Sequence, residues 1–170
     1  MESGETKCQA RVTTALKSIN KESFLSLAVE FKDIMGFEIK PIWIDFSHGV
    51  SLSYRSKRGG GFFKFNTHLY DKPNGFYDSY SQSDINSPVI VINDFVLEPK
   101  GQGFGTKIIM RFIEEISKTN FNMIYLQALD ERAATFWGRF GFAFIPVSDS
   151  SVTMPAMKLH LNPIITIPIK

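Results

Sequence analysis

Apolar residues near the start of the chain recur at helical spacing. Between Phe24 and Met35 they return every three or four positions, which predicts an amphipathic helix. Asn20 is a favourable N-cap for that helix, and Gly36 is a natural end because glycine readily adopts the left-handed conformation that closes helices. A shorter helix is predicted over residues 12–19. The chain therefore begins with two helices.

The period of the pattern changes to two in the next segment. Apolar and other residues alternate over 42–54 around a turn at 47–49, and this alternation predicts a β-hairpin. A further strand begins at residues 63–65. From 68 to 87 the composition turns to Asp, Asn, Ser, Pro, Gly and Tyr, which is typical of a long loop.

The second half alternates strands with helices. A continuous apolar run over 89–97, interrupted by Asn93 and Asp94, predicts a buried strand. Two parallel strands joined by a helix form a right-handed crossover, so the whole chain predicts a mixed sheet in an α+β domain. The remaining predicted elements are helices over 104–118 and 131–140 and strands over 123–129, 142–147 and 152–161.

Composition limits the classes of function. A chain of 170 residues, 44% of them hydrophobic, fits one domain over 1–170. Nineteen Lys and Arg against seventeen Asp and Glu are too balanced to bind nucleic acid or anionic lipid by bulk charge. The single cysteine, Cys8, excludes an internal disulfide and a cysteine-based zinc site. No apolar run reaches the about 18 residues of a membrane helix, and residues 1–10 lack a signal-peptide pattern, so the expected location is cytoplasmic.

The segment KGQGFG, from Lys100 to Gly105, is the most informative part of the chain. It is not a Walker loop, because Lys107 follows Thr106 rather than glycine. Its glycines are also one residue too close together for the GxGxxG dinucleotide fingerprint. Glycines between a buried strand and a long helix leave unpaired N–H groups at the positive end of the helix dipole, which suits a phosphate or pyrophosphate. On the glycines alone, a turn that merely starts the helix fits equally well.

Two blocks of sequence resemble the GNAT superfamily of N-acetyltransferases. KGQGFG resembles the family's Arg/Gln-x-x-Gly-x-Gly/Ala signature, whose loop holds the pyrophosphate of acetyl-coenzyme A. At the family's spacing, Asp130–Phe142 resembles its Asn-x-x-Ala-x-x-Phe-Tyr-x-x-x-Gly-Phe block. The resemblance covers about 89–161, the half that would bind acetyl-coenzyme A; 1–88 would supply the acceptor side, and 162–170 form a tail. It implies a GNAT-like, mixed, mostly antiparallel central sheet flanked by helices, with splayed fourth and fifth strands.

The resemblance also implies how acetyl-coenzyme A, as a cosubstrate, would lie. In this family the pantetheine arm pairs with the backbone of the fourth strand, and one N–H there stabilises the oxyanion of the tetrahedral intermediate. No metal is expected, because the histidines lack the spacing of metal ligands. The implied coenzyme-binding residues are Phe95, Val96, Leu97, Lys100, Gly101, Gln102, Gly103, Phe104, Gly105, Thr106, Asp130 and Phe136.

The sequence departs from the family pattern at the catalytic positions. Trp137 stands where the family has the Tyr that usually serves as general acid, and an indole N–H cannot supply a proton near neutral pH. Tyr125 is a replacement candidate; alternatively the thiolate leaves unassisted, since a thiol pKa of about 8.5 makes a tolerable leaving group. Asp94 is the candidate general base, because relatives that acetylate polyamines carry Glu-Asp where this chain has Asn93-Asp94. A purely structural hydrogen bond to a neighbouring loop is the alternative for Asp94.

The expected activity is acetyl transfer to a primary amine by direct attack, with a small-molecule or protein amine as acceptor and with neither nucleic acid nor membrane as partner. A non-catalytic acyl-coenzyme A binding or sensing domain of the same fold is one alternative, which Trp137 favours. A protein-interaction module is another. The basic residues at 55–58 are interpreted as a solvated hairpin tip, because no basic stripe accompanies them. Alternating apolar residues over 163–169 could add an edge strand, within the chain or across a homodimer.

Overall fold

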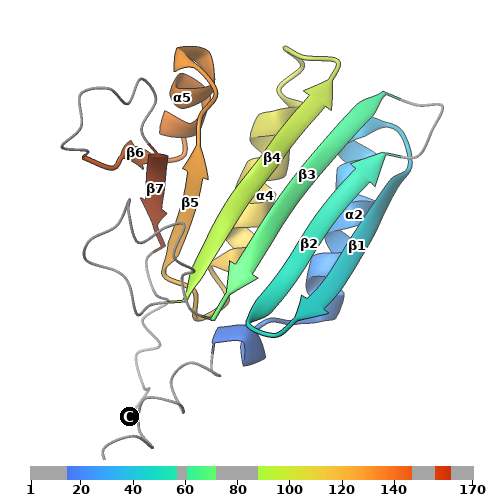
Figure 1. Ribbon diagram of the computed structural model, residues 1–170. Coiled ribbons are helices and arrows are strands. Elements are labelled where there is room, and N and C mark those ends of the chain that lie inside the picture. Colours follow the sequence, from blue (N-terminus) through green and yellow to red (C-terminus); the bar gives the residue numbers. More distant parts are fainter. Residues whose placement is uncertain (1–14, 57–60, 72–87, 147–155, 162–170) are drawn as a thin grey trace, which may run out of the picture.

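A mixed sheet runs through the protein in the order β1-β2-β3-β4-β5-β7-β6 (Figure 1). The computed structural model describes residues 15–56, 61–71, 88–146 and 156–161, and the structural statements below concern these residues. The strands are β1 (Ile39–Phe46), β2 (Gly49–Ser56), β3 (Phe62–Tyr70), β4 (Val89–Glu98), β5 (Met123–Gln127), β6 (Ala143–Phe144) and β7 (Ala156–His160). The labelled helices are α2 (Lys21–Met35), α4 (Phe104–Ile116) and α5 (Glu131–Gly138).

Antiparallel pairing dominates this sheet. Each of β1, β2 and β3 pairs antiparallel with the next strand, as do β5 with β7 and β7 with β6. Within the described chain only β4 and β5 pair in parallel, and α4 forms the crossover between them. The predicted α+β class, with a mixed and mostly antiparallel sheet, is therefore confirmed.

The first long helix begins and ends where the apolar spacing predicts. The Asn20 side chain accepts a hydrogen bond from the backbone N–H of Ser23 at 3.3 Å and so caps the first turn of α2. Gly36 closes the helix with φ of 78°, a conformation that a residue with a Cβ adopts only at a cost. After this end, the short turn at 47–48 joins β1 to β2 as the predicted hairpin.

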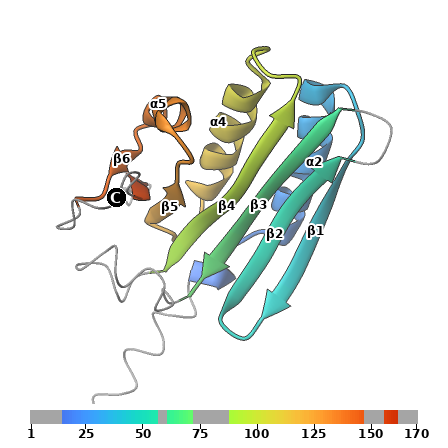
Figure 2. The same ribbon diagram turned by 45° about the horizontal axis from the view of Figure 1, so that its top comes forward.

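Both long helices cover the same face of β1 to β4 (Figure 2). Phe112 of α4 is fully buried, with its ring centroid 4.8 Å from that of Phe65 on β3 and 6.3 Å from that of Phe24 on α2. Phe31 of α2 makes a similar edge contact, 4.9 Å, with Tyr54 of β2. Aromatic pairs of this kind add about 0.5–1.5 kcal/mol each beyond the burial of their area. The rings thus hold α2 and α4 against the centre of the sheet.

No helix of the described residues covers the opposite face of the sheet at β1 to β4 (Figure 1). Because side chains alternate across a strand, and Phe63 and Phe65 point toward the helices, Lys64, Asn66 and His68 of β3 point the other way. We call this side of β1 to β4 the open face. Beside it, the same side of the sheet becomes apolar at β5 and β7. A second, smaller cluster of buried side chains lies there, formed by Val89, Met123, Tyr125, Ile145 and Ala156.

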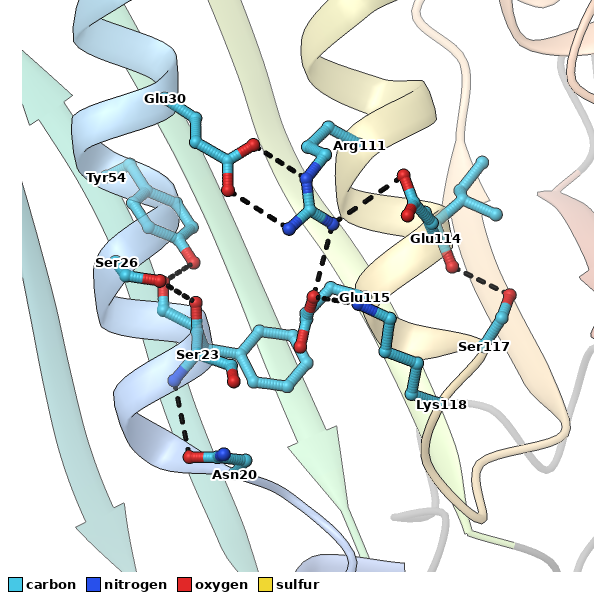
Figure 3. Close-up of polar contacts among 12 residues, drawn as sticks. Asn20, Ser23, Ser26, Glu30, Tyr54, Arg111, Glu114, Glu115, Ser117 and Lys118 are labelled. Carbon is cyan, nitrogen blue, oxygen red and sulfur yellow. Dashed lines mark hydrogen bonds and ion pairs between the residues drawn. The ribbon is translucent and has the colours of Figure 1, made fainter.

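Arg111 links the two long helices (Figure 3). Its Nε and Nη2 donate to the two carboxylate oxygens of Glu30 on α2 at 2.6 and 3.0 Å, and its Nη1 donates to Glu115 at 3.1 Å. Lys118 donates to the same Glu115 carboxylate at 2.9 Å. Glu115 is buried, so these two cations offset the cost of removing a carboxylate from water.

Protonation states in this cluster follow from burial and hydrogen bonding. Burial alone would raise the pKa of Glu115, but the hydrogen bonds from Lys118 and Arg111 outweigh it and hold that pKa below its ordinary value. Burial, and secondarily the charge of Glu115, raise the pKa of Tyr54. The phenol therefore stays protonated and donates to the Phe24 carbonyl at 2.6 Å.

Some element boundaries differ from the prediction. β3 continues to Tyr70, so residues 68–70 belong to a strand rather than to the predicted loop, because pairing with both β2 and β4 overrides their local composition. The strand predicted over 142–147 is shorter, with two residues in β6, and the strand predicted over 152–161 is described only from Ala156, where β7 begins. The start of the first helix, the Tyr-bearing stretch 72–87 and the tail 162–170 lie outside the described residues.

We predict that Phe112→Ala lowers the free energy of unfolding by about 3–5 kcal/mol, because it removes the ring at the junction of α2, α4 and β3. Chemical denaturation followed by circular dichroism measures the change. Met110→Ala, two residues away on the solvent side of the same helix and 60% exposed, is the matched control and should change the value by less than about 0.5 kcal/mol. Equal effects of the two changes would contradict the assigned core.

We further predict that Glu115 makes folding stability depend on acid pH. A carboxyl whose pKa is lowered on folding stabilises the protein above its unfolded pKa of about 4.3, and this contribution is lost as the pH falls through the lower folded pKa. In Glu115→Gln, stability should therefore fall less between about pH 5 and 3 than in the wild type. Glu114→Gln, at an exposed position on the same helix, should keep the wild-type pH dependence. Parallel curves for wild type and Glu115→Gln would disprove the assignment.

Candidate active site

β4 leaves β5 halfway along its length. The two strands pair only where Ile90, Val91 and Ile92 face residues 124–126. From Asn93 to Glu98 this edge of β4 has no strand beside it in the described chain, while its other edge stays paired with β3 (Figure 1). The splay between the fourth and fifth strands that the resemblance implies is thus present.

A bulge marks the point where the strands part. Ile92 pairs with Thr67 and Asp94 pairs with Asn66, so Asn93 is an extra residue on β4 with no counterpart on β3. A bulge bends a strand and increases its twist. It also shifts the alternation of side chains, which explains why Ile92 and Phe95, three residues apart, both pack toward the helices. The bulge therefore accounts for the change in direction of β4.

The glycine turn lies at the far end of this open edge. Gly101 and Gly103 have φ of 80° and 75°, values that strongly favour glycine. Gly103 is the N-cap of α4 and supplies no side-chain hydrogen bond. The first intrahelical bond runs from Lys107 N–H to the Gly103 carbonyl at 3.3 Å. The N–H groups of residues 104–106 precede this bond and have no partner within the helix, so they are available to an anion.

Close packing holds the start of α4 against β4. A Cβ added to Gly105 would lie 3.2 Å from Leu97 Cδ2, 3.3 Å from Phe95 Cε1 and 3.5 Å from Phe136 Cζ. The first two of these contacts would be tighter than ordinary packing, so the absence of a Cβ lets helix and strand approach each other. The Phe95 ring also stacks on Phe136, with centroids 5.9 Å apart and planes 13° apart. The side chains of Phe95 and Leu97 are thus turned into the core, which leaves their backbone groups along the open edge.

Charge near the turn is carried by exposed lysines. Lys100 lies 3.6 Å from Glu98, and both side chains are more than half exposed, so this ion pair is weak. Lys107 is exposed on the first turn of α4, and Thr106 is half-buried beside it. The exposed side chain of Gln102 completes the turn. The turn and the first turn of α4 therefore carry two exposed ammonium groups near the N–H groups of residues 104–106.

Trp137 occupies a buried position in an aromatic cluster. Its ring centroid lies 5.7 Å from Phe95, 5.1 Å from Phe136 and 5.4 Å from Phe142. Only 6% of the residue is exposed. The indole thus packs β4 against α5, and the position that carries Tyr in the resembled family serves here as core.

Asp130 has a structural role at the start of α5. Its Oδ1 accepts a hydrogen bond from the backbone N–H of Ala133 at 2.7 Å, which makes it the N-cap of the helix. Asn and Asp are equally good at this position, so the change from the family's Asn keeps the cap. Any contact with a coenzyme is an additional role.

Asp94 is engaged by two partners on β3. Lys64 Nζ lies 2.9 Å from its Oδ2, and Asn66 Nδ2 donates to the same oxygen at 2.7 Å. The hydrogen bond from Lys64 is the main reason that the pKa of Asp94 lies below its ordinary value; partial burial opposes the shift, and the bond from Asn66 supports it. The carboxylate is therefore ionised and already satisfied near neutral pH, which makes it a weak base.

Tyr125 lies in a different environment from Asp94. It is only 1% exposed, within the second cluster on β5, and it pairs in register with Val91 on β4 and Lys158 on β7. The described structure thus puts the two sequence-derived catalytic candidates in separate places, Asp94 on the open face and Tyr125 in the small core.

One pair of polar groups was not expected from the sequence. His68 Nδ1 lies 2.6 Å from Asn93 Nδ2 across the β3–β4 ladder. The composition of residues 68–87, rich in Asp, Asn and Ser, predicts a loop that includes this histidine. The overlooked signal was the alternation of Phe63, Phe65 and Leu69, which extends the strand and puts His68 on its polar side.

Neither a metal-binding cluster nor a membrane-spanning helix is found among the described residues. Among the described residues, no group of three His, Cys, Asp or Glu side chains could hold a metal ion. Within those residues, no helix has the length and apolar character needed to cross a membrane.

No protein-family model and no curated protein matches the chain. Solved structures that resemble it include AtaTR bound with AcCoA, with 13% identity, 66% of this chain and 68% of that chain covered, and a TM-score of 0.46. A KacTA–DNA complex has 13% identity, covers 84% and 81%, and has a TM-score of 0.44. AtaT complexed with acetyl-methionyl-tRNAfMet has 14% identity, covers 65% and 71%, and has a TM-score of 0.45. Likenesses this distant assign no activity; the fold rests on the strand order and the splay.

We predict that Lys64→Gln raises the pKa of the Asp94 carboxyl toward its ordinary value, because the neutral amide no longer stabilises the carboxylate. NMR titration of the side-chain carboxyl carbon measures the shift. Lys107→Gln, a change of equal charge on α4, is the control and should leave the titration unaltered. An unchanged titration in Lys64→Gln would show that the ion pair does not form in solution.

Proposed function

We propose that this protein transfers an acetyl group from acetyl-coenzyme A to a primary amine. The observation that carries the proposal is the open edge of β4 from Asn93 to Glu98, which leads directly into the glycine turn at the start of α4. An open strand edge pairs with an extended amide chain, and a helix start binds phosphate. Coenzyme A carries an amide-containing arm and a pyrophosphate in this order.

The glycine turn would hold the pyrophosphate. Gly101 and Gly103 provide the left-handed conformations that bend the backbone, and the N–H groups of Phe104, Gly105 and Thr106 would donate to phosphate oxygens. The exposed ammonium of Lys100 would add charge, since its ion pair with Glu98 breaks at little cost, as would that of Lys107. The neighbouring Gln102 amide is a further donor.

The open edge of β4 would hold the pantetheine arm. Asn93 to Glu98 spans roughly 17 Å at about 3.3 Å per residue, a length of the same order as that arm. Phe95, Val96 and Leu97 would pair with it through backbone groups. A backbone N–H next to the bulge would polarise the thioester carbonyl and stabilise the oxyanion. Phe136, stacked on Phe95, would form the floor of this site, and Asp130 would support it by capping α5.

The thiolate needs either a general acid or a low enough pKa to leave unassisted. Tyr125 remains a candidate, but its burial among the side chains of the second cluster separates it from the open edge of β4. We favour departure of the thiolate without an acid, because a thiol pKa of about 8.5 makes that step feasible. Asp94, ionised and held by Lys64, would orient the acceptor rather than take its proton.

A non-catalytic acyl-coenzyme A binding or sensing domain is a second candidate. The observation in its favour is Trp137, which fills the general-acid position with a buried indole. The same glycine turn and open strand edge would serve either function. Turnover separates the two, because a sensor binds the coenzyme without releasing its thiol.

The acceptor is proposed as a primary amine on a small molecule or a protein. A panel of polyamines, amino-acid amides and short peptides tests this class by thiol release. Aminoacyl-tRNA is included in the panel, because one of the solved structures above is a complex with acetyl-methionyl-tRNAfMet. Thiol release with none of these, together with tight coenzyme binding, would favour the sensor.

We predict that acetyl-coenzyme A binds the wild-type protein. Gly103→Ala should weaken binding at least about tenfold, or about 1.4 kcal/mol. A side chain disfavours φ of 75°, so the substitution should displace the backbone N–H groups of residues 104–106. Isothermal titration calorimetry measures the affinity. Gly36→Ala is the matched control: Gly36 has φ of 78°, and an added Cβ there, as at Gly103, would meet no atom within 4 Å. Both variants should lose similar stability, and only Gly103→Ala should lose affinity. Unchanged binding in Gly103→Ala would remove the pyrophosphate assignment.

A further inference from the structure

Two polar pairs lie side by side on the open face, where β4 bulges away from β5. Asp94 is bound by Lys64, and Asn93 is bound by His68. We propose that His68 is the general base that takes the proton of the acceptor amine, an assignment that rests on the proposed acetyltransferase function. Asn93 is then the positioning residue that orients the imidazole ring. The acceptor would approach over the open face.

Asp94 is poorly suited to that role. A general base needs a pKa near the working pH, and the lysine contact moves Asp94 in the wrong direction. Histidine is the side chain that ordinarily changes charge between about pH 5 and 8. His68 is half-buried, so its ring reaches solvent and a bound acceptor while remaining positioned by its neighbours.

Aromatic rings define the orientation of His68. The Phe46 ring of β1 lies 6.1 Å from the imidazole centroid at 84°, and the Tyr70 ring of β3 lies 5.8 Å from it at 48°. Phe46 and Tyr70 also contact each other at 5.8 Å. With these rings on one side and Asn93 on the other, the imidazole has a defined plane and one ring nitrogen already engaged.

The contact with Asn93 determines which nitrogen can act. As placed, the amide nitrogen Nδ2 of Asn93 lies against Nδ1, so Asn93 donates and the proton of a neutral ring is on Nε2. A half-turn exchanges the amide nitrogen and oxygen with nearly the same outline, and the role proposed for His68 requires this turned orientation. With its oxygen toward the ring, Asn93 accepts Nδ1–H and leaves the Nε2 lone pair free. This orientation also stabilises the imidazolium, because Nδ1–H remains a donor after Nε2 is protonated.

The His68–Asn93 pair lies where the thioester end of the pantetheine arm is expected. The open edge of β4 begins at Asn93, because pairing with β5 ends at Ile92. An arm that starts at the glycine turn and follows β4 would therefore bring its thioester next to Asn93. His68, in contact with Asn93, is then close to the carbon that the amine attacks.

The described neighbours of His68 named here are either uncharged or paired with each other. Lys64 and Asp94 on the same face form an ion pair with each other. The cross-strand neighbours Ser51 on β2 and Val91 on β4 carry no charge. The His68 imidazole packs against the neutral Phe46 ring of β1. Its titratable ring neighbour on β3 is the Tyr70 phenol.

The chemistry balances with one proton transfer. The amine nitrogen donates its lone pair to the thioester carbonyl carbon, and the new C–N bond forms a tetrahedral intermediate. His68 Nε2 takes one proton from that nitrogen. The C–S bond then breaks, the thiolate leaves with its electron pair, and the proton passes from His68 through solvent to the thiolate. The products are the N-acetyl amine and free coenzyme A thiol.

The test compares pH profiles of kcat/KM for the best acceptor in the panel, calculated on the neutral amine. The wild type should lose activity on the acid side as His68 becomes protonated. His68→Gln should lower kcat by about 100-fold or more and lose that acid limb, while acetyl-coenzyme A affinity stays unchanged. Asn93→Asp should move the limb to higher pH, because a carboxylate stabilises the imidazolium. His160→Gln, an exposed histidine on β7, is the control and should keep the wild-type profile.

A second readout is independent of turnover. Nitrogen-15 NMR of the imidazole should show the neutral ring with its proton on Nδ1, and Asn93→Ala should remove this preference. An intact acid limb in a folded His68→Gln, or a proton on Nε2 in the wild type, would overturn the assignment of the base alone. A wild type that binds acetyl-coenzyme A but acetylates no amine in the panel would overturn the catalytic function and the base together.

Discussion

The candidate site depends on the unequal pairing of β4 at its two edges. Toward β3 the ladder runs along the whole strand, whereas toward β5 it covers three residues. The bulge at Asn93 bends β4 away at the point where that second ladder ends. Backbone groups beyond the bulge would be costly to leave buried without partners, so a strand edge of this kind either faces solvent or accepts a partner. The glycine turn, the start of α4 and the polar pairs of the open face all lie along this edge.

A site built on such an edge needs rigid support from behind. Phe112, Phe65 and Phe24 tie α2 and α4 to the far side of the sheet, and Arg111 joins the two helices by charge. Gly105 then lets α4 start in contact with β4. The aromatic contacts come from fully buried side chains, and rigid elements hold a site more accurately than loops do. The packing of the core therefore fixes where the N–H groups of residues 104–106 lie relative to the open edge of β4.

The open face places two chemically different pairs next to each other. The pair of Asp94 with Lys64 joins two opposite charges, whereas the pair of His68 with Asn93 joins an imidazole to a neutral amide. Their proximity follows from the bulge, because it puts two consecutive residues of β4 within reach of β3. Without the bulge, the strict alternation of side chains along a strand would have turned either Asn93 or Asp94 toward the helices.

Much of the architecture was determined by the sequence alone. Apolar spacing predicted α2 with its cap at Asn20, the first hairpin, β4, α4 and β5, and KGQGFG marked the turn that begins α4. These features depend on local periodicity and on glycine torsions, which neighbouring residues decide. Tertiary structure decided the rest. Pairing with two strands extended β3 through His68, the shifted register made Asn93 a bulge, and contacts across 28 and 25 residues joined Asp94 to Asn66 and Asn93 to His68. Such contacts depend on which strands lie side by side, and no local pattern contains that information.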